Sequence, residues 1–214
     1  MDNKVTMALD ECNVIAKIGR YYSFDKAISS EDCDAFLEKY KKFNFESGAI
    51  WKFDDTGEKN KSWSQNQENV EISTDKRDSA IYWADINDAV VVAMWACVLE
   101  ANQHYKLNIK GYTPAQITRY EEGSFYDWHQ DSFYHAQRTV HERKISAILQ
   151  LSKPEDYEGG ELQLFNGQND PEILPIKDQG SVIVFRSEEW HRVTKLIKGT
   201  RYSLVFWSVG DPLV

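Results

Sequence analysis

The sequence has few cysteines and no pattern that would join them. It contains three, Cys12, Cys33 and Cys97, and no two of them form a CxxC pair. Disulfide frameworks and cysteine zinc sites use several cysteines at short spacings, so this sequence disfavours both. We therefore expect free thiols in a reducing, cytoplasmic setting, with Cys97 packed in the core.

Long apolar runs and an excess of basic residues are also missing. No apolar stretch approaches the roughly 20 residues that cross a bilayer, and the opening segment MDNKVTMALDECNV has no signal-peptide core. The 25 basic and 34 acidic residues give a net charge of −9. A surface of that sign repels phosphate backbones. The sequence thus predicts no membrane span and disfavours nucleic acid as a partner.

Aromatic residues are abundant, with seven Trp, eleven Tyr and ten Phe among 214 residues. Such rings bury large areas and several carry a polar end, which indicates an aromatic core or pocket. A chain of this length can bury a core without disulfides and is normal for one β-rich domain.

The first half of the chain predicts two helices. A short strand is expected at 21–27. The segment Ser29-Ser30-Glu31-Asp32 then has the pattern of a helix N-terminus. The apolar residues between 86 and 105 recur at i, i+3 and i+4, which predicts a long helix that packs on a sheet. The polar stretch 45–80 is typical of either a long loop or a loose hairpin.

After Gly111 the pattern changes to short strands separated by turn residues. The expected strands are AQITRY, KISAILQL, GELQLF, ILPI, SVIVF, WHRVTKL and TRYSLVFW. Strands that follow helices in this way predict an α+β, mainly β fold: a double-stranded β-helix (a jelly roll, cupin-like) with helices packed on one sheet. We expect a single domain over 1–214, with a helical and loop support region at 1–110 and a catalytic jelly-roll core at 111–214.

The segment RYEEGSFYDWHQDSF holds the first chemical motif. On a strand, His129 and Asp131 point to the same face, so an imidazole and a carboxylate can reach one cation. His191, in the later segment EEWHRVTKL, is the candidate third ligand. Two histidines and one carboxylate suit Fe(II) and leave coordination positions open. Zinc accepts the same ligands, so the triad by itself leaves the metal open.

The other three histidines show that histidines often have other roles, so a single HxD pair is weak evidence for a metal site. His104 lies near the end of a predicted helix and is expected to be structural. His135 and His141 follow the motif in a loop, where they are expected to be solvated or to touch a substrate.

Arg201 follows His191 across the turn Lys198-Gly199. We expect a hairpin there, with the strand of Arg201 beside that of His191. Its guanidinium would then bind the distal carboxylate of 2-oxoglutarate through two parallel hydrogen bonds, as a bidentate pair. Ser203 faces the same way and offers another hydrogen bond. Tyr120 is a candidate hydroxyl donor to the same molecule. The alternative for Arg201 is a surface arginine in an ion pair. The alternative for Tyr120 is a tyrosine that packs in the core.

Three segments, RYEEGSFYDWHQD, ISAILQLSKPEDYEGGELQLF and GSVIVFRSEEWHRVTKLIKGTRYSLVFW, resemble the prolyl 4-hydroxylase-like branch of the Fe(II)/2-oxoglutarate oxygenases, and the PKHD-type hydroxylases in particular. The likeness covers about 117–207. It implies His129, Asp131 and His191 as iron ligands and Arg201 as the partner of the 5-carboxylate. The implied cofactors are Fe(II), 2-oxoglutarate and O2, with ascorbate as a reductant.

The resemblance also assigns residues to the pocket. Tyr120 matches a tyrosine that lines the co-substrate site. Gln150 falls where relatives carry a tyrosine that hydrogen-bonds the same carboxylate, a departure from the pattern. Val193 and Leu162 fall at apolar wall positions, and Trp207 matches an aromatic near the pocket floor.

The implied reaction is hydroxylation coupled to the conversion of 2-oxoglutarate to succinate and CO2. Asp131 favours hydroxylation, because related halogenases lack this carboxylate. The expected substrate is a peptidyl, prolyl-type side chain, and a free amino acid or other small molecule is the main rival. AlkB-like demethylation of nucleic acid is disfavoured by the acidic charge. A metal-bearing jelly roll that binds without turnover is the alternative from another class. The sequence gives no signal for an oligomeric state.

The polar segments 51–80 and 132–143 are expected to form lids or a groove for the substrate. The residues expected to contact it are Trp63, Tyr126, Phe133, Tyr134 and Arg138.

Overall fold

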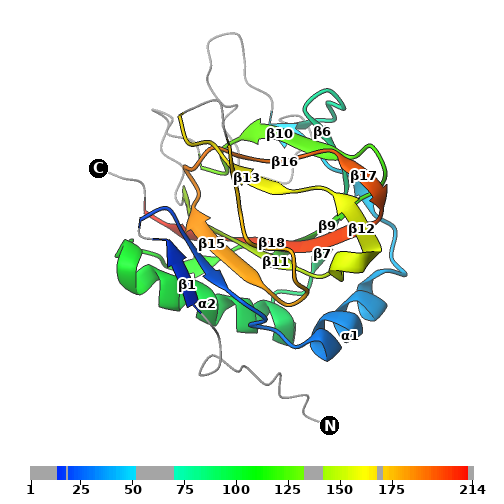
Figure 1. Cartoon of the computed structure of the whole chain (residues 1–214). Coiled ribbons are helices and arrows are strands. Elements are labelled where there is room, and N and C mark those ends of the chain that lie inside the picture. Colours follow the sequence, from blue (N-terminus) through cyan, green and yellow to red (C-terminus); the bar gives the residue numbers. More distant parts are fainter. Residues whose placement is uncertain (1–13, 18, 52–69, 133–141, 168–170, 212–214) are drawn as a thin grey trace.

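The computed structural model of the chain describes residues 14–17, 19–51, 70–132, 142–167 and 171–211. Two antiparallel sheets face each other, and two helices cover the outer side of the larger one (Figure 1). This is the predicted double-stranded β-helix with helices packed on one sheet.

The larger sheet has nine strands, and its neighbours are far apart in sequence. Its strands in spatial order are β1 (Val14–Lys17), β2 (Tyr21–Phe24), β15 (Val182–Arg186), β11 (Glu142–Gln150), β18 (Arg201–Gly210), β9 (Ala115–Tyr120), β7 (Ala80–Ala84) and β3 (Glu46–Ser47), with β8 (Gly111–Tyr112) on β18. The N-terminal part of the chain therefore supplies strands as well as helices. β7 was not anticipated, because AIYWA is short and lies between the polar stretch 45–80 and the predicted helix at 86–105.

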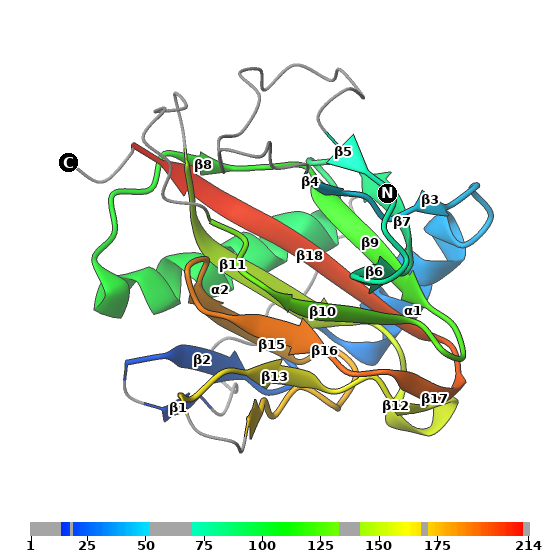
Figure 2. The ribbon, with the colours of Figure 1, turned by 90° about the horizontal axis from the view of Figure 1, so that it is seen from above.

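The smaller sheet has five strands and lies across from the centre of the larger one (Figures 1 and 2). In order these are β14 (Glu172–Ile173), β13 (Leu162–Leu164), β16 (His191–Val193), β10 (Phe125–His129) and β6 (Arg77–Asp78). The expected strand ILPI (173–176) is wrong apart from its first residue: β14 ends at Ile173, and residues 174–176 form no strand. Within 45–80, β4 (Ile50–Trp51) pairs with β5 (Val70–Glu71), which favours the hairpin alternative.

The helices begin where side chains cap them. α1 (Ser30–Tyr40) follows Ser29, whose Oγ accepts a hydrogen bond from the backbone N–H of Asp32 at 3.1 Å. α2 (Ala89–Tyr105) starts after Asp88 rather than at 86, because the Asp88 carboxylate accepts the backbone N–H of Val90. Cys97 is buried in α2, as predicted. Among the described residues, no helix is long and apolar enough to span a membrane.

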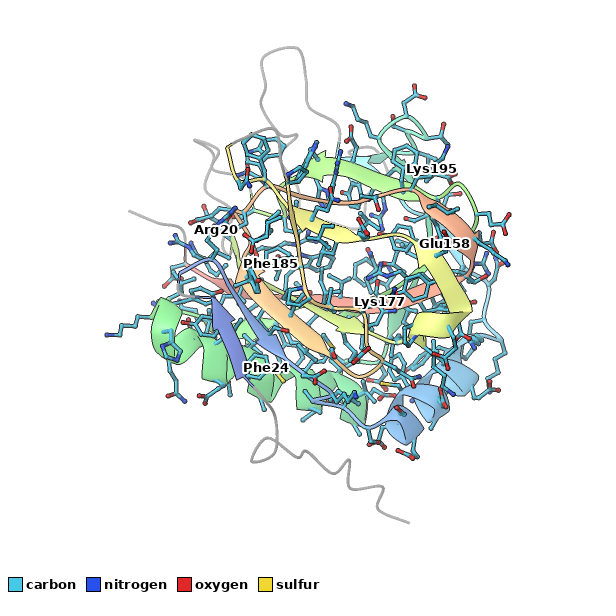
Figure 3. The ribbon with its side chains drawn as sticks, in the orientation of Figure 1. Arg20, Phe24, Glu158, Lys177, Phe185 and Lys195 are labelled. Carbon is cyan, nitrogen blue, oxygen red and sulfur yellow. The ribbon has the colours of Figure 1, made fainter. Side chains whose placement is uncertain are left out.

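Period-two alternation divides the core into two layers. On β11, Ala147 and Leu149 pack toward the helices, whereas Ile148 packs between the sheets. The same alternation along β2 and β15 places Phe24 in the helix-side core and Phe185 in the core between the sheets (Figure 3). Some members of the inner layer, such as Ile148, also line a cavity between the sheets.

The hairpin predicted between His191 and Arg201 is wrong. The strand that follows β16 is β17 (Leu196–Gly199), which pairs with β12 (Tyr157–Gly159) in a separate ribbon. The chain then turns at Gly199, where φ is +81°, and enters the larger sheet as β18. A Cβ at Gly199 would lie 2.1 Å from the Asp156 carbonyl oxygen. Arg201 therefore lies on the sheet opposite His191, because in a jelly roll the chain crosses between sheets.

Candidate metal centre and active site

His129, Asp131 and His191 come together at one end of the smaller sheet. His129 ends β10 and His191 begins β16, and the two are directly paired across the strands. Asp131 lies just beyond β10, where its backbone N–H donates to the Ser187 carbonyl at 2.9 Å. The HxD spacing therefore places both side chains on one face, and β-pairing adds the distant histidine.

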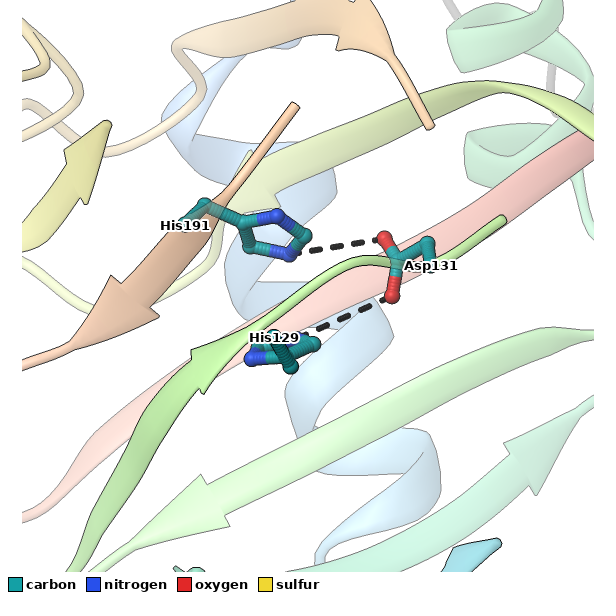
Figure 4. A group of neighbouring side chains, drawn as sticks. All are labelled: His129, Asp131 and His191. Atoms are coloured by element: carbon teal, nitrogen blue, oxygen red, sulfur yellow. Dashed lines mark ion pairs between the residues drawn. The ribbon is translucent and has the colours of Figure 1, made fainter. Parts of the chain in front are cut away.

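The three side chains converge on one point (Figure 4). Asp131 Oδ1 lies 3.7 Å from His129 Nε2, and Asp131 Oδ2 lies 3.5 Å from His191 Nε2. One ligand atom from each residue lies within 4.8 Å of the other two. Asp131 and His191 are buried, so the cluster is open to little water.

Hydrogen bonds to the backbone orient both imidazoles. His129 Nδ1 lies 2.7 Å from the Asp127 carbonyl oxygen, and His191 Nδ1 lies 2.8 Å from that of Glu189. A carbonyl oxygen only accepts, so each Nδ1 carries the proton and donates. Each Nε2 then presents its lone pair toward Asp131, as metal-binding histidines do.

The Asp131 carboxylate is also fixed from behind. Ser146 Oγ, on β11, donates to Asp131 Oδ2 at 2.7 Å, and its oxygen lies 3.0 Å from Ser187 Oγ. This bond links a residue of the larger sheet to the cluster on the smaller one. It holds one carboxylate oxygen in place and leaves Oδ1 beside His129.

The charge states of the ligands are those that a cation requires. Burial, together with the neighbouring His191, lowers the pKa of His129 to about 3. Burial alone would raise the pKa of Asp131, but His191, His129, Arg143 and the Ser146 hydroxyl lower it to about 2. At neutral pH the site therefore holds a neutral His129 and an ionised Asp131.

This donor set fits a divalent transition metal. Two imidazole nitrogens and one carboxylate oxygen on one side are typical of Fe(II) oxygenases, because the remaining positions stay open. The same ligands suit zinc, so the geometry by itself does not distinguish the two metals.

Arg201 faces this cluster from the larger sheet. It is 2% exposed, and its Nε donates to Gln150 Oε1 at 3.1 Å. Its Nη1 is buried and has no acceptor among the described residues. Arg201 pairs directly with Tyr120 across β18 and β9, and its guanidinium carbon lies 5.6 Å from that ring. An unpaired guanidinium N–H in a buried site fits a ligand carboxylate.

A cavity of about 210 Å³ joins Arg201 to the cluster. Strand alternation supplies one wall, because alternate residues of β18 line it from the larger sheet. These residues are Arg201, Ser203, Val205 and Trp207. The smaller sheet contributes Leu162 and Val193, as the resemblance implied.

Most of the expected site residues that the structure describes lie at this cavity, including Tyr120 and Tyr126. Tyr126 stacks on His129, with ring centroids 3.5 Å apart. Gln150 does not line the cavity: its Nε2 donates to the Ser152 carbonyl, and its Oε1 accepts from Arg201. Seven residues named in the sequence analysis lie outside the described residues: Cys12, Trp63, Phe133, Tyr134, His135, Arg138 and His141. His104 is remote and stacks on Tyr22.

Two arginines of the cavity wall were not anticipated. Arg77 comes from β6, within the polar stretch 45–80, and Arg143 comes from the beginning of β11. Neither arginine belongs to a recognisable motif. An arginine at the edge of a polar segment is usually a surface residue, so no sequence signal pointed to either one. Only the pairing of β6 with β10 brings Arg77 to the metal ligands.

Residues 115–209 match the family model described as the 2OG-Fe(II) oxygenase superfamily. Curated relatives include PKHD-type hydroxylases of Acidovorax ebreus (32% identity; 44% of this chain and 42% of the relative) and Acinetobacter baumannii (30%; 57% and 53%). The chain thus spans about half the length of the curated relatives it matches.

Solved structures share the fold at low sequence identity. A Pseudomonas putida prolyl-4-hydroxylase has a TM-score of 0.63 at 22% identity, covering 91% of this chain and 95% of that one. A viral collagen prolyl hydroxylase of Paramecium Bursaria Chlorella virus-1, solved as a 2OG complex, has a TM-score of 0.63 at 18% identity, covering 92% and 99%. The match to the 2OG-Fe(II) oxygenase superfamily model over residues 115–209 includes all three metal-ligand candidates and Arg201, and this part of the chain is similar to PKHD-type hydroxylases.

Proposed function

We propose that this protein is an Fe(II)- and 2-oxoglutarate-dependent hydroxylase. The observation that carries the proposal is one cavity with two complementary ends. One end holds His129, Asp131 and His191 in their metal-binding charge states, and the other holds Arg201 with a buried N–H that has no acceptor. Such a pair of ends suits a metal and a dicarboxylate at the same time.

Each residue has a defined task in this reaction. When bound, Fe(II) supplies the activation of O2 that couples decarboxylation of 2-oxoglutarate, to succinate and CO2, with hydroxylation of a C–H bond. His129, Asp131 and His191 hold the metal. Arg201 binds the distal carboxylate and fixes the orientation of the co-substrate. Asp131 fills a ligand position with a carboxylate, which favours hydroxylation over halogenation.

The remaining wall excludes water and positions the co-substrate. Ile148, Leu162 and Val193 give the cavity apolar surface between its two ends. Ser203 lies beside Arg201 on the same face of β18 and offers a hydroxyl to the carboxylate. Tyr120 offers a second hydroxyl there, and burial raises its pKa, so it stays protonated and able to donate.

For the prime substrate, the first candidate is a peptidyl, prolyl-type side chain. The structural neighbours that carry prolyl hydroxylase in their names support it, including one from Trichoplax adhaerens solved with a hypoxia inducible factor peptide fragment (TM-score 0.58, 20% identity). A free amino acid or similar small molecule is the second candidate. Arg77 and Arg143 favour it, because they add positive charge to the cavity.

Anaerobic titration of the purified protein with Fe(II) and then 2-oxoglutarate tests the proposal. A weak visible charge-transfer band is expected when 2-oxoglutarate binds the loaded protein, and Arg201→Ala should need far more 2-oxoglutarate to produce it. Substrate-independent release of succinate in air provides a second readout. Folded, iron-loaded protein that gives neither signal would favour the non-catalytic, metal-bearing binding protein instead.

A further inference from the structure

We propose that Arg77 and Arg143 bind a carboxylate carried by the prime substrate, so that this enzyme acts on an anionic compound. The inference rests on the proposed function and names the class of substrate for that site. It starts from an imbalance of charge at the cavity wall.

The described cavity wall contains three guanidinium groups and one carboxylate. The guanidiniums belong to Arg77, Arg143 and Arg201, and the carboxylate belongs to Asp131. With Fe(II) and the dianion of 2-oxoglutarate bound, the positive charges exceed the negative ones by two. A buried excess of charge is unfavourable unless a ligand neutralises it. A neutral substrate would leave this excess in place, whereas a carboxylate would reduce it.

Arg77 is held in the wall by groups that leave its charge unneutralised. It is 6% exposed. Its Nε donates to Ser79 Oγ at 2.8 Å and its Nη1 to the Ala49 carbonyl at 3.3 Å. These acceptors are neutral, and no described carboxylate lies within ion-pair distance. The guanidinium carbon lies 4.6 Å from the Tyr126 ring centroid, and Tyr126 stacks in turn on His129. A positive charge therefore lies one ring, that of Tyr126, away from the candidate metal ligand His129.

Arg143 approaches the same region from the larger sheet. Its guanidinium carbon lies 3.6 Å from the Trp207 ring centroid, and among the described residues it too forms no ion pair. Its positive charge acts on both Asp131 and Tyr126, as does that of Arg77 on Tyr126. Arg143 thus flanks the cluster on the side of Trp207. Arg77 lies beside Tyr126, and its charge also acts on Tyr120, the strand partner of Arg201.

Trp207 adds an independent sign of a missing acceptor. It is 5% exposed and lines the cavity, and its Nε1–H has no acceptor among the described residues. A buried N–H without a partner is unfavourable, so such groups are usually satisfied by a ligand or water. Two unneutralised guanidiniums and one unpaired indole N–H form a donor set that a substrate carboxylate satisfies.

Fluorine NMR with a carboxylate probe tests the site without turnover. Protein loaded with Mn(II) and saturating 2-oxoglutarate keeps Arg201 occupied, and Mn(II) broadens the signal of any fluorine bound nearby. Trifluoroacetate and its neutral counterpart trifluoroacetamide are compared. Loss of one charge-assisted hydrogen bond lowers affinity by about tenfold or more. The acid is therefore expected to be broadened much more than the amide, and Arg77→Gln/Arg143→Gln should remove the difference.

Matched variants keep this test interpretable. Arg143→Lys retains the charge without the planar fork and should keep part of the preference for the acid. Arg192→Gln is the control, because Arg192 stacks on Trp128 at 4.6 Å on the opposite face of β16 and should not affect the probe. Equal broadening of acid and amide, or a preference that survives the double variant, overturns the inference. If the Fe(II)-loaded protein shows the 2-oxoglutarate band but the Mn(II)-loaded protein shows no preference for the acid, the carboxylate site is wrong and the proposed function stands.

The origin of the carboxylate is then resolved by activity. Succinate release is compared between free amino acids and their amides, and between proline peptides that carry Glu and the same peptides with Gln. Stimulation by the free acids assigns a small-molecule substrate, and stimulation by the Glu peptides assigns an acidic peptide. An amide or Gln peptide that turns over as fast as its acidic counterpart contradicts the role of Arg77 and Arg143.

Discussion

Gln150 accepts a hydrogen bond from Arg201 across 51 residues of sequence, with its Oε1 3.1 Å from the arginine Nε. Both side chains are buried, and the Gln150 amide nitrogen is fixed in turn by the Ser152 carbonyl. Gln150 therefore sets the direction in which the guanidinium meets a ligand, and it has no surface on the cavity.

Gln150→Leu should weaken 2-oxoglutarate binding, because it leaves the Arg201 Nε unpaired and free to turn. We expect the dissociation constant for 2-oxoglutarate to rise about tenfold, the equivalent of one lost buried hydrogen bond. Fe(II) affinity should change little. Gln163→Leu is the matched control, since Gln163 accepts from Arg192 in a similar pair at 2.8 Å. If both variants raised the dissociation constant for 2-oxoglutarate equally, Gln150 would have no specific role in positioning Arg201.

Ser146→Ala should weaken metal binding. It removes the 2.7 Å hydrogen bond to Asp131 Oδ2 and lets the carboxylate rotate. Loss of such an outer contact typically lowers metal affinity by about 10–100-fold. The measurement is competition for Fe(II) with a chelator under anaerobic conditions. Ser208→Ala is the control, because Ser208 is a buried serine on β18 whose hydroxyl has no partner among the described residues. An unchanged affinity in Ser146→Ala would contradict the prediction.

The metal-free protein should lose stability as the pH falls below 6.5. The ordinary pKa of histidine is 6.5, and the folded protein lowers that of His129 to about 3, chiefly through burial. Between these values the unfolded chain binds the proton and the folded one does not, so stability rises with pH in this window. One such group contributes up to about 1.4 kcal/mol per pH unit. His129→Gln should flatten the dependence measured by urea unfolding in the presence of a chelator. A slope equal to that of the wild type would show that His129 is not the group responsible.

Gly199→Ala should destabilise the crossover that brings Arg201 to the cavity. It adds strain at a φ of +81° and places a Cβ 2.1 Å from the Asp156 carbonyl oxygen. We expect a loss of at least about 3 kcal/mol, which lowers the melting temperature by about 6–12 °C. Gly167→Ala separates the two causes, since its φ is +75° and no atom lies within 4 Å of the new Cβ. That variant should lose only about 1 kcal/mol, and an equal loss in both variants would rule out the clash.

The sequence by itself determined the local features of this protein. Period-two alternation and turn residues indicated the strands from 115 onward, and helical periodicity with capping residues indicated α1 and α2. The spacing of His129 and Asp131 placed two ligand side chains on one face of a strand, because alternation is a property of the strand alone. His191 and Arg201 were also candidates from the sequence, and the family resemblance implied the same roles for both, but no local pattern joins either one to the pair.

Only the tertiary structure decided how distant segments meet. The turn at Gly199 transfers the chain to the larger sheet, so Arg201 faces His191 across the cavity and does not lie beside it. Gln150 has its effect only through Arg201. Arg77 and Arg143, in sequence two ordinary basic residues, reach one cavity through the pairing of β6 with β10 and of β11 with β18. Contacts of this kind depend on the crossing of sheets, and strand periodicity carries no information about which strands will face each other.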